Sequence, residues 1–255
     1  MDDILGLNDL PAGDTVILAI MTYTGYNQED AIIMNQASID RGLFRQVIYK
    51  GYKTVQKRTR STTEEFTRPV VRRDEPAERY SAIDENGIAR LGSFVREGDC
   101  IIGKVRKNIV TGRVENASTY VGVGQEGIVD RVLVSTNPEG MRVVKVKLRQ
   151  IRKPIMGDKF ASRHAQKSTL GLILPQEDMP YTAGGITPDI IINPHCIPSR
   201  MTIAKLIEIV SSKIAAFSGE RVNATAYRGF DIKTFKENLT QYGYSSSGKE
   251  RMFSG

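Results

Sequence analysis

The chain has 255 residues, of which 40% are hydrophobic and 25% are charged, so it has the composition of a globular protein with one large domain or two small ones. Its two cysteines, Cys100 and Cys196, form no CxxC pair, and the two histidines are far apart, so the sequence indicates neither a disulfide framework nor a zinc site. No charged-then-apolar leader opens the sequence, and the longest apolar run, 16–21, is too short to cross a bilayer. We therefore expect an intracellular protein of a reducing compartment, without a membrane partner.

The first part of the chain, 1–44, predicts a buried strand followed by a helix. Residues 16–21 are continuously apolar, and Asn27 is a residue type that caps helices, with Asp30 at the third position of the helix it would begin. Glu29 and Asp30 would then lie in the first turn, where the helix dipole favours acids. The same two carboxylates are also hard oxygen ligands of the kind that Mg²⁺ prefers, and their spacing leaves both interpretations open.

The middle part, 45–150, predicts β-structure throughout. Turn signals at 84–87, 96–99 and 137–140 separate short apolar runs, and residues 143–149 alternate between apolar and basic side chains, as a half-buried strand does. Segment 53–79 is charged and has no clear period, so we expect a mobile excursion there. Residues 122–127 match the pattern GxGxxG, but a strand-like run follows them where a dinucleotide site requires a helix, so we reject that site.

Excess positive charge is concentrated between Arg142 and Lys167. This stretch contains nine Lys or Arg and one acid, whereas the whole chain has a net charge of +7. Within it, Lys159, Arg163 and Lys167 are four residues apart, which would place them on one side of a helix. Such a charge density favours a polyanionic partner, and the alternative is a solvated basic surface without one.

The last part, 151–255, predicts a buried strand at 190–192 and one strong helix. Apolar residues recur with helical spacing from Ile203 to Phe217, Ser199 would cap the helix, and Gly219 would end it. Arg200 would then lie in the first turn, where the dipole disfavours a cation by about 0.3–1 kcal/mol unless an anion binds there. Arg200 is therefore either a phosphate ligand or the partner of a nearby carboxylate.

Several motifs in register resemble a known family. They read GYNQEDAIIMN at 25–35, DRGLF at 40–44, GDKFASRHAQK at 157–167, GITPD at 185–189 and NPHCIPSRMT at 193–202. In this order they resemble the second-largest, bacterial β-like subunit of multisubunit DNA-directed RNA polymerases, in the branch of eukaryotes, archaea and large DNA viruses. The resemblance covers nearly the whole chain. It departs at Ala165 and Ser168, where the family usually has glycine.

The resemblance implies a mixed α+β, β-rich fold. Residues 1–44 and 151–255 would form the two parts of a hybrid-binding domain that contains a double-psi β-barrel, and residues 45–150 would form an inserted β-rich wall, or flap, domain. Because the family's subunit is much longer, this chain would be a fragment or a split subunit. Its partners would be the largest subunit, the remaining domains of the second-largest subunit, the DNA template, the RNA–DNA hybrid and NTPs. Its location would be the nucleus in a eukaryotic cell, or the virion or cytoplasm for a virus.

The resemblance also implies roles for particular residues. Lys159 and Lys167 would line the active centre, and Arg200 would contact the phosphates of the incoming nucleotide. Glu29 and Asp30 would lie near the second Mg²⁺, which arrives with the nucleotide, whereas the largest subunit would hold metal A.

Arg163 and His164 would support this surface for nucleic acid and nucleotide. The chain would contribute a cationic clamp to phosphodiester formation and would be active only within the complex. The alternative is a noncatalytic module that binds an RNA–DNA hybrid or single strands through phosphate contacts.

Overall fold

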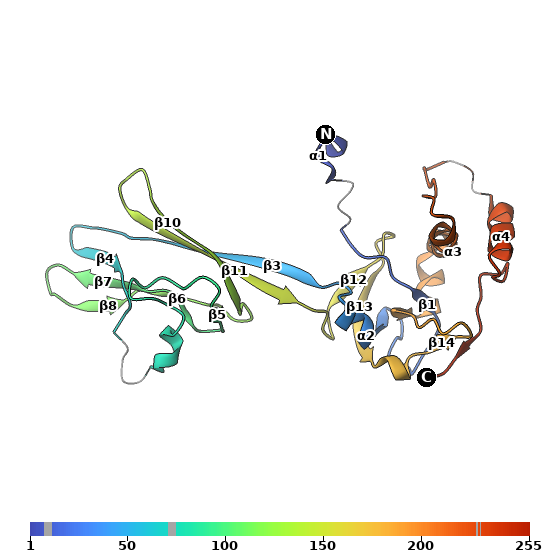
Figure 1. Cartoon of the computed structure of the whole chain (residues 1–255), viewed down its shortest axis with the longest axis horizontal. Helices are drawn as coiled ribbons and strands as arrows, with labels where there is room; N and C mark the ends of the chain where they lie inside the picture. The colour runs from blue at the N-terminus through green and yellow to red at the C-terminus, as the bar shows by residue number, and fades with distance from the viewer. Residues whose placement is uncertain (8–11, 71–74, 228, 230) are drawn as a thin grey trace. The chain divides into compact units, whose positions relative to one another are not determined.

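The chain divides into two compact units, each with its own strands and core (Figure 1). The computed structural model describes residues 1–7, 12–70, 75–227, 229 and 231–255. Unit 1 contains residues 1–45 and 153–255, and unit 2 contains residues 46–152. Most regular structure is strand, with a smaller share of helix, so the predicted mixed α+β, β-rich fold is confirmed.

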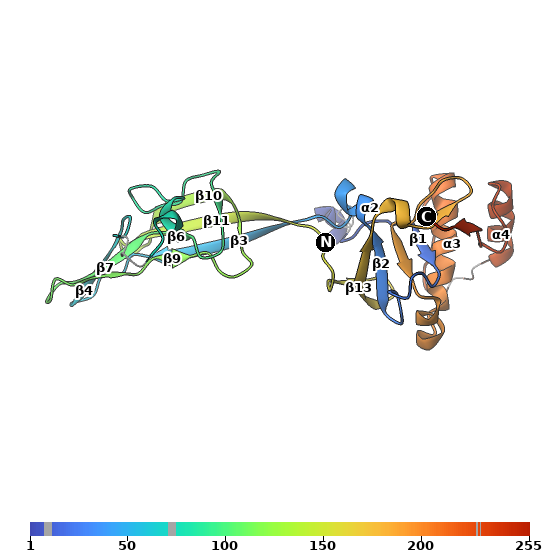
Figure 2. The same ribbon diagram turned by 90° about the horizontal axis from the view of Figure 1, so that it is seen from below.

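Unit 1 is built on a five-stranded sheet (Figure 2). Its strands, in spatial order, are β1 (Leu18–Ile20), β15 (Ile190–Ile192), β2 (Ala31–Asn35), β13 (Lys167–Leu174) and β12 (Lys159–Ala161). β1 pairs with β15 and β2 pairs with β13 in parallel, and the other two pairings are antiparallel. Ile32 and Met34 are buried in one apolar cluster and Ile33 in another, so the central strand β2 is covered on both faces. The buried strand predicted at 190–192 is confirmed. A strand also lies within 16–21, but it is half-buried and not buried as predicted, because β1 is at the edge of the sheet and pairs on one side only.

The helices of unit 1 are α1 (Asp2–Leu5), α2 (Gln36–Arg41), α3 (Ile203–Ser218) and α4 (Ile232–Gln241). Its 3₁₀ turns include η3 (Gln176–Asp178), η4 (Pro194–Cys196) and η5 (Pro198–Arg200), and a short ribbon pairs β14 (Tyr181–Thr182) with β16 (Met252–Phe253). α3 ends at Gly219, whose φ of 74° is left-handed, as the sequence predicted. Phe217 of α3 stacks on Tyr242 beyond α4, with ring centroids 5.3 Å apart. None of the helices in the described ranges is both long enough and apolar enough to span a bilayer.

The predicted helix beginning at Asn27 is wrong. Asn27 is buried in a turn, where its side chain accepts a hydrogen bond from the N–H of Tyr23 (3.2 Å) and donates one to the carbonyl of Met21 (2.7 Å). The chain then enters β2, and the helix starts only at Gln36, capped by Asn35. Pairing of β2 on both sides, with β15 and β13, satisfies the backbone of the apolar run as a strand and outweighs the local capping signal.

Unit 2 consists of antiparallel sheets. One has the order β3 (Gln46–Val55), β11 (Arg142–Arg152), β10 (Gly127–Thr136) and β5 (Phe94–Val95). A second has β4 (Thr62–Phe66), β7 (Lys104–Asn108) and β8 (Val114–Asn116), and β6 (Cys100–Ile102) pairs with β9 (Thr119–Tyr120). A short 3₁₀ turn, η2 (Ala77–Tyr80), completes the unit.

Several predictions for this part of the chain are confirmed by unit 2. In the described part of unit 2, the regular structure is β apart from η2, and residues 122–126 form a turn that leads into β10 at Gly127, not a dinucleotide-binding helix. The predicted alternation in β11 is also confirmed, because Val144, Val146 and Leu148 are buried and the basic residues between them are exposed. Both cysteines are free and buried.

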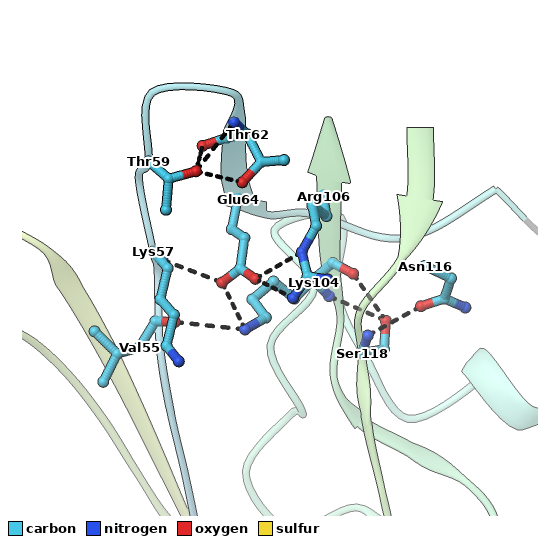
Figure 3. Close-up of polar contacts among 9 residues, drawn as sticks. All are labelled: Val55, Lys57, Thr59, Thr62, Glu64, Lys104, Arg106, Asn116 and Ser118. Atoms are coloured by element: carbon cyan, nitrogen blue, oxygen red, sulfur yellow. Dashed lines mark hydrogen bonds and ion pairs between the residues drawn. The ribbon is translucent and has the colours of Figure 1, made fainter. Parts of the chain in front are cut away.

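A buried ion-pair network ties β4 into unit 2 (Figure 3). The carboxylate of Glu64, 2% exposed, accepts hydrogen bonds from Lys104 Nζ (2.8 Å), from Arg106 Nη2 (2.8 Å) and from the backbone N–H of Lys57 (3.1 Å). Burial opposes ionisation of Glu64, but these hydrogen bonds outweigh it and lower its pKa to about 2. We expected a mobile excursion at 53–79, but the end of β3 and all of β4 are regular strands, so the prediction is wrong for them. Residues 71–74 lie outside the described part of the chain.

Candidate functional site

Glu29 and Asp30 lie in an exposed turn directly before β2. Glu29 has a left-handed backbone with φ 49°, and the carbonyl of Asp30 accepts a hydrogen bond from the N–H of Thr169 in β13 (3.0 Å). Because β2 and β13 are parallel, this bond holds the acidic turn at the start of both strands. The two acids are not in a helix, so the helix dipole does not explain why they are adjacent.

The turn that carries Glu29 and Asp30 packs closely against β13 at Gly171, which has no side chain. A Cβ added to Gly171 would lie 2.7 Å from the carbonyl oxygen of Tyr26, which is much closer than real contacts allow. The β2–β13 register also shifts between Leu170 and Leu172, so Gly171 occupies a local irregularity. The absence of a side chain at this position therefore lets the turn that carries Glu29 and Asp30 approach β13.

Lys159 and Lys167 lie on a β-hairpin, so the helix predicted from their spacing is wrong. β12 pairs with β13 in a register that places Lys159 opposite Thr169 and Ala161 opposite Lys167. Residues paired in this way share a face, so the two lysines are diagonal neighbours on one exposed face. The two lysines are eight residues apart in the sequence, and the chain reverses between them through a loop in which Ala165 N–H donates to the carbonyl of Ser162 (3.1 Å).

Ala165 has a left-handed backbone with φ 57°. This conformation favours glycine, and it is one of the two positions at which the family resemblance departs from glycine. The loop between β12 and β13 therefore contains an alanine in a left-handed conformation, at a cost of about 1–2 kcal/mol.

Arg200 lies before α3 and not in its first turn. It ends η5, Met201 follows with φ 53°, and Thr202 precedes the first helical residue, so the predicted cap at Ser199 is wrong. Because Pro198 and Met201 set a separate 3₁₀ turn, Arg200 is directed towards the sheet. Its Nη2 lies 2.6 Å from Oδ1 of Asp30, and its Nη1 donates to the carbonyl of Lys167 (3.5 Å).

These contacts join the side chains of Arg200 and Asp30, and they join Arg200 to the backbone of Lys167. Asp30, Lys167 and Arg200 come from a turn, a strand and a 3₁₀ turn that are far apart in the sequence, and Lys159 lies on the same hairpin face as Lys167. The carboxylate partner of Arg200, which the sequence left open, is Asp30. The ion pair is partly open to solvent, since the side chains of Arg200 and Asp30 are 31% and 53% exposed.

Arg163 and His164 contact α3, not the Asp30–Arg200 pair. Arg163 Nε donates to Oε1 of Glu208 (2.6 Å), and His164 Nε2 bonds the other carboxylate oxygen of Glu208. Sequence reasoning did not select Glu208. The sequence indicated Glu208 only as an acid between two apolar residues of the predicted helix, Ile207 and Ile209.

One turn earlier, Lys205 of α3 supports the same hairpin. Lys205 is 6% exposed, and its Nζ donates to Oε1 of Gln166 (2.7 Å), which is also buried and bonds Thr202. Burial lowers the pKa of Lys205 below its ordinary value. The start of α3 therefore holds the hairpin loop at both of its ends, directly beside Lys167, and neither Lys205 nor Gln166 was selected from the sequence.

The basic run 142–167 does not belong to one unit. Residues 142–152 lie in unit 2 and residues 153–167 lie in unit 1. The single basic run in the sequence therefore contributes cations to two units, to β11 in unit 2 and to the β12–β13 hairpin in unit 1.

The described residues contain no group of three or more His, Cys, Asp or Glu side chains that could hold a metal ion alone. Glu29 and Asp30 supply two carboxylates, of which Asp30 is already paired with Arg200. They are hard oxygen donors, so they fit a Mg²⁺ ion that brings its remaining ligands with it better than one held by protein alone.

Comparison with known proteins gives the family. The chain belongs to the family RNA polymerase Rpb2, domain 6, whose model matches residues 2–255. The chain is 44% identical to DNA-directed RNA polymerase II subunit RPB2 of Schizosaccharomyces pombe over 98% of this chain and 22% of that protein. It is 43% identical to DNA-directed RNA polymerase II subunit 2 of Arabidopsis thaliana over 98% of this chain and 22% of that protein.

An archaeal relative is similar to nearly the same extent. The identity to DNA-directed RNA polymerase subunit Rpo2 of Saccharolobus solfataricus is 39%, over 99% of this chain and 24% of that protein. The predicted resemblance to the second-largest polymerase subunit is thereby confirmed. The chain spans less than a quarter of the length of these relatives.

Proposed function

We propose that this chain is part of the active centre of a DNA-directed RNA polymerase, where it binds the RNA–DNA hybrid and clamps the phosphates of the incoming nucleotide. Unit 1 would be the hybrid-binding domain, drawn from 1–44 and 151–255, with its sheet as part of a double-psi β-barrel. Unit 2 would be the wall, or flap, domain, drawn from 45–150. Family membership supports the reaction class, and the geometry of unit 1 supports the assignment of the site.

The observation that carries this proposal is the convergence of Arg200, Asp30 and Lys167. A pure phosphate-binding surface gains nothing from an acid beside its cations, because the acid repels the ligand. A nucleotide–metal complex carries both signs of charge, so cations for its phosphates and carboxylates for its metal belong side by side. The Arg200–Asp30 distance of 2.6 Å places the two signs in contact.

The residues would act on charge that develops during the reaction. The RNA 3′ hydroxyl attacks the α-phosphate, a new oxygen–phosphorus bond forms, and pyrophosphate leaves with the electrons of the broken bond. Arg200, with a planar guanidinium, would bind phosphate oxygens in a bidentate manner. Lys159 and Lys167 would place two further cations near the reacting groups and stabilise the negative charge of the transition state.

Mg²⁺ supplies Lewis-acid stabilisation of the triphosphate in this chemistry. Glu29 and Asp30 would hold the ion that arrives with the nucleotide, and metal A would belong to the largest subunit. Arg163 and His164, bound to Glu208, would support the hairpin that carries both lysines.

The partners would be the largest subunit, the remaining domains of the second-largest subunit, the DNA template and NTPs. The relatives compared above are cellular, so they support a nuclear or other cellular location and give no support to a viral or virion one.

Replacing Arg200 tests the nucleotide clamp. In the polymerase assembled with the subunit that contains this chain, we expect Arg200→Ala to raise the apparent KM for nucleotides about tenfold or more, because a charged hydrogen bond to phosphate contributes about 1.5–3 kcal/mol. Arg200→Lys should restore only part of this loss, since lysine cannot bind in a bidentate manner.

The matched control is Arg113→Ala, because Arg113 is 79% exposed and lies in unit 2. It should leave nucleotide kinetics unchanged. An Arg200→Ala polymerase with normal KM and normal kcat would refute the role of Arg200 in the proposed site.

A further inference from the structure

Lys205 is a buried lysine of α3 that forms no ion pair with any residue the structure describes. Its Nζ donates to a neutral acceptor, Oε1 of Gln166, at 2.7 Å. It is also the third residue of α3, in the first turn, where the helix dipole disfavours a cation. Since an apolar side chain of similar size would fill such a buried position without these costs, packing alone does not explain a lysine here.

Gln166 joins Lys205 to the residue that precedes α3. Gln166 is buried, and its Nε2 donates to the hydroxyl of Thr202. A threonine directly before a helix usually caps it, but Thr202 makes no side-chain hydrogen bond to the backbone of α3. Thr202 and Lys205 therefore both use their side chains to hold Gln166, at the expense of the helix that they begin.

Gln166 is the residue directly before Lys167, and the two side chains lie on opposite faces of the hairpin. The N–H of Ser162 donates to the carbonyl of Gln166 (3.3 Å), which continues the β12–β13 pairing one residue before the start of β13. Successive side chains of an extended chain point to opposite faces, and Gln166 is buried while Lys167 is exposed. A restraint on the side chain of Gln166 therefore holds the backbone from which Lys167 extends.

The loop before Lys167 requires such a restraint. Ala165 has φ 57°, a left-handed conformation that is unfavourable for a residue with a Cβ. A strained backbone persists when the surrounding structure holds it in place. Among the contacts described between this loop and α3, the bond between Gln166 and Lys205 is buried and lies directly beside Lys167.

We infer that Lys205 is a positioning residue for nucleotide addition, which acts through Gln166 to hold Lys167 in the active centre. This inference rests on the proposed function, in which Lys167 stabilises negative charge near the reacting groups. Lys205 itself is buried and would not contact the nucleotide. A charged group stabilises a transition state best when it is already in place before the reaction, and a misplacement of about 1 Å can lower a rate about a hundredfold.

Lys205→Met tests this inference in the polymerase assembled with the subunit that contains this chain. Methionine is a flexible, unbranched side chain that fills the space but cannot donate to Gln166. We expect kcat for nucleotide addition to fall about tenfold, with the apparent KM for nucleotides changed less than about twofold, because an interaction of the transition state is weakened. Lys205→Arg keeps a donor and should restore most of kcat. Gln166→Met removes the same bond from the hairpin and should lower kcat to the same extent.

The matched control is Lys213→Met, the same substitution about two turns further along α3. Lys213 forms an ion pair with Glu250, and its side chain is 31% exposed. The control polymerase should have normal kcat and normal KM. Thermal unfolding of each assembled polymerase measures any loss of stability separately from the loss of kcat.

A double-mutant cycle with Lys167→Ala separates positioning from a general loss of structure. If Lys205 acts through Lys167, adding Lys205→Met to Lys167→Ala should lower kcat less than about twofold further. A further tenfold loss would refute the inference, because Lys205 would then act independently of Lys167.

Two other outcomes separate this inference from the proposed function. If Lys167→Ala lowers kcat while Lys205→Met and Gln166→Met leave it normal, the positioning role of Lys205 is wrong and the proposed function stands. If Lys167→Ala itself leaves kcat normal, the proposed role of Lys167 is wrong, and the positioning role of Lys205 is overturned with it.

Discussion

At the scale of single residues, both units contain a buried ionisable side chain that is hydrogen-bonded to other side chains. Lys205 in unit 1 bonds Gln166, and Glu64 in unit 2 bonds Lys104 and Arg106. Burying a charge is costly unless it is paired and hydrogen-bonded. Such residues therefore fix one arrangement of the segments they join: the hairpin loop against α3 in unit 1, and β4 against β7 in unit 2.

The Glu64 network predicts a particular pH dependence of stability. The folded-state pKa of Glu64, about 2, is below its ordinary value of 4.5, so its ionised form is favoured in the folded state. This contribution, about 3 kcal/mol, is fully present above pH 4.5 and is lost as the pH falls towards 2. The free energy of unfolding, measured with urea across this range, should fall more steeply for the unaltered chain than for Glu64→Gln.

Glu115→Gln is the control for this measurement, because Glu115 is 56% exposed and only 4.0 Å from Arg113. It should follow the pH dependence of the unaltered chain. Parallel curves for Glu64→Gln and the unaltered chain would show that the buried carboxylate does not provide this part of the acid sensitivity.

At the scale of elements, the sequence predicted strands better than it predicted the local setting of the site. Continuous apolar runs and the alternation in β11 predicted the strands, because the pattern of apolar residues indicates whether one or both faces of a strand are buried. The helix proposed at Asn27 and the helix proposed through Lys159 and Lys167 both failed. In each case a local helical signal competed with strand partners that lie more than 100 residues away or across a loop, and the sequence does not show those partners.

The candidate site follows the same pattern. Motif resemblance selected Asp30, Lys167 and Arg200, which the structure brings together. It did not select Lys205, Gln166 or Glu208, because their roles depend on the contact between α3 and the hairpin. A lysine and an acid within an apolar helix were the only sequence signals for that contact.

The close approach of the acidic turn to β13 gives an element-scale prediction. A methyl group at Gly171 would collide with the carbonyl of Tyr26, so we expect Gly171→Ala to displace the turn and lower the free energy of unfolding by about 1–3 kcal/mol. Urea denaturation at neutral pH measures this change. Gly184→Ala is the matched control in unit 1, since the nearest atom to its added Cβ is 3.9 Å away. Equal stability of the two variants would contradict the proposed contact.

At the scale of the whole molecule, each unit has its own buried core. Ile101 of β6 and Ile191 of β15 are both 0% exposed, and they lie in different apolar clusters in unit 2 and unit 1. Since the packing around each residue is confined to its own cluster, damage to one core should not remove packing from the other. The two units should therefore respond separately to core substitutions.

We expect Ile101→Ala to lower hydrogen-exchange protection in peptides from unit 2, and Ile191→Ala to lower it in peptides from unit 1, each by about 2–5 kcal/mol. Hydrogen exchange read by mass spectrometry assigns the loss to a segment. The matched controls are Ile109→Ala in unit 2 and Ile203→Ala in unit 1, whose side chains are 56% and 67% exposed and whose truncation should change little. If either core substitution lowers protection equally in both units, the chain unfolds as a single cooperative body, and the two cores are energetically one.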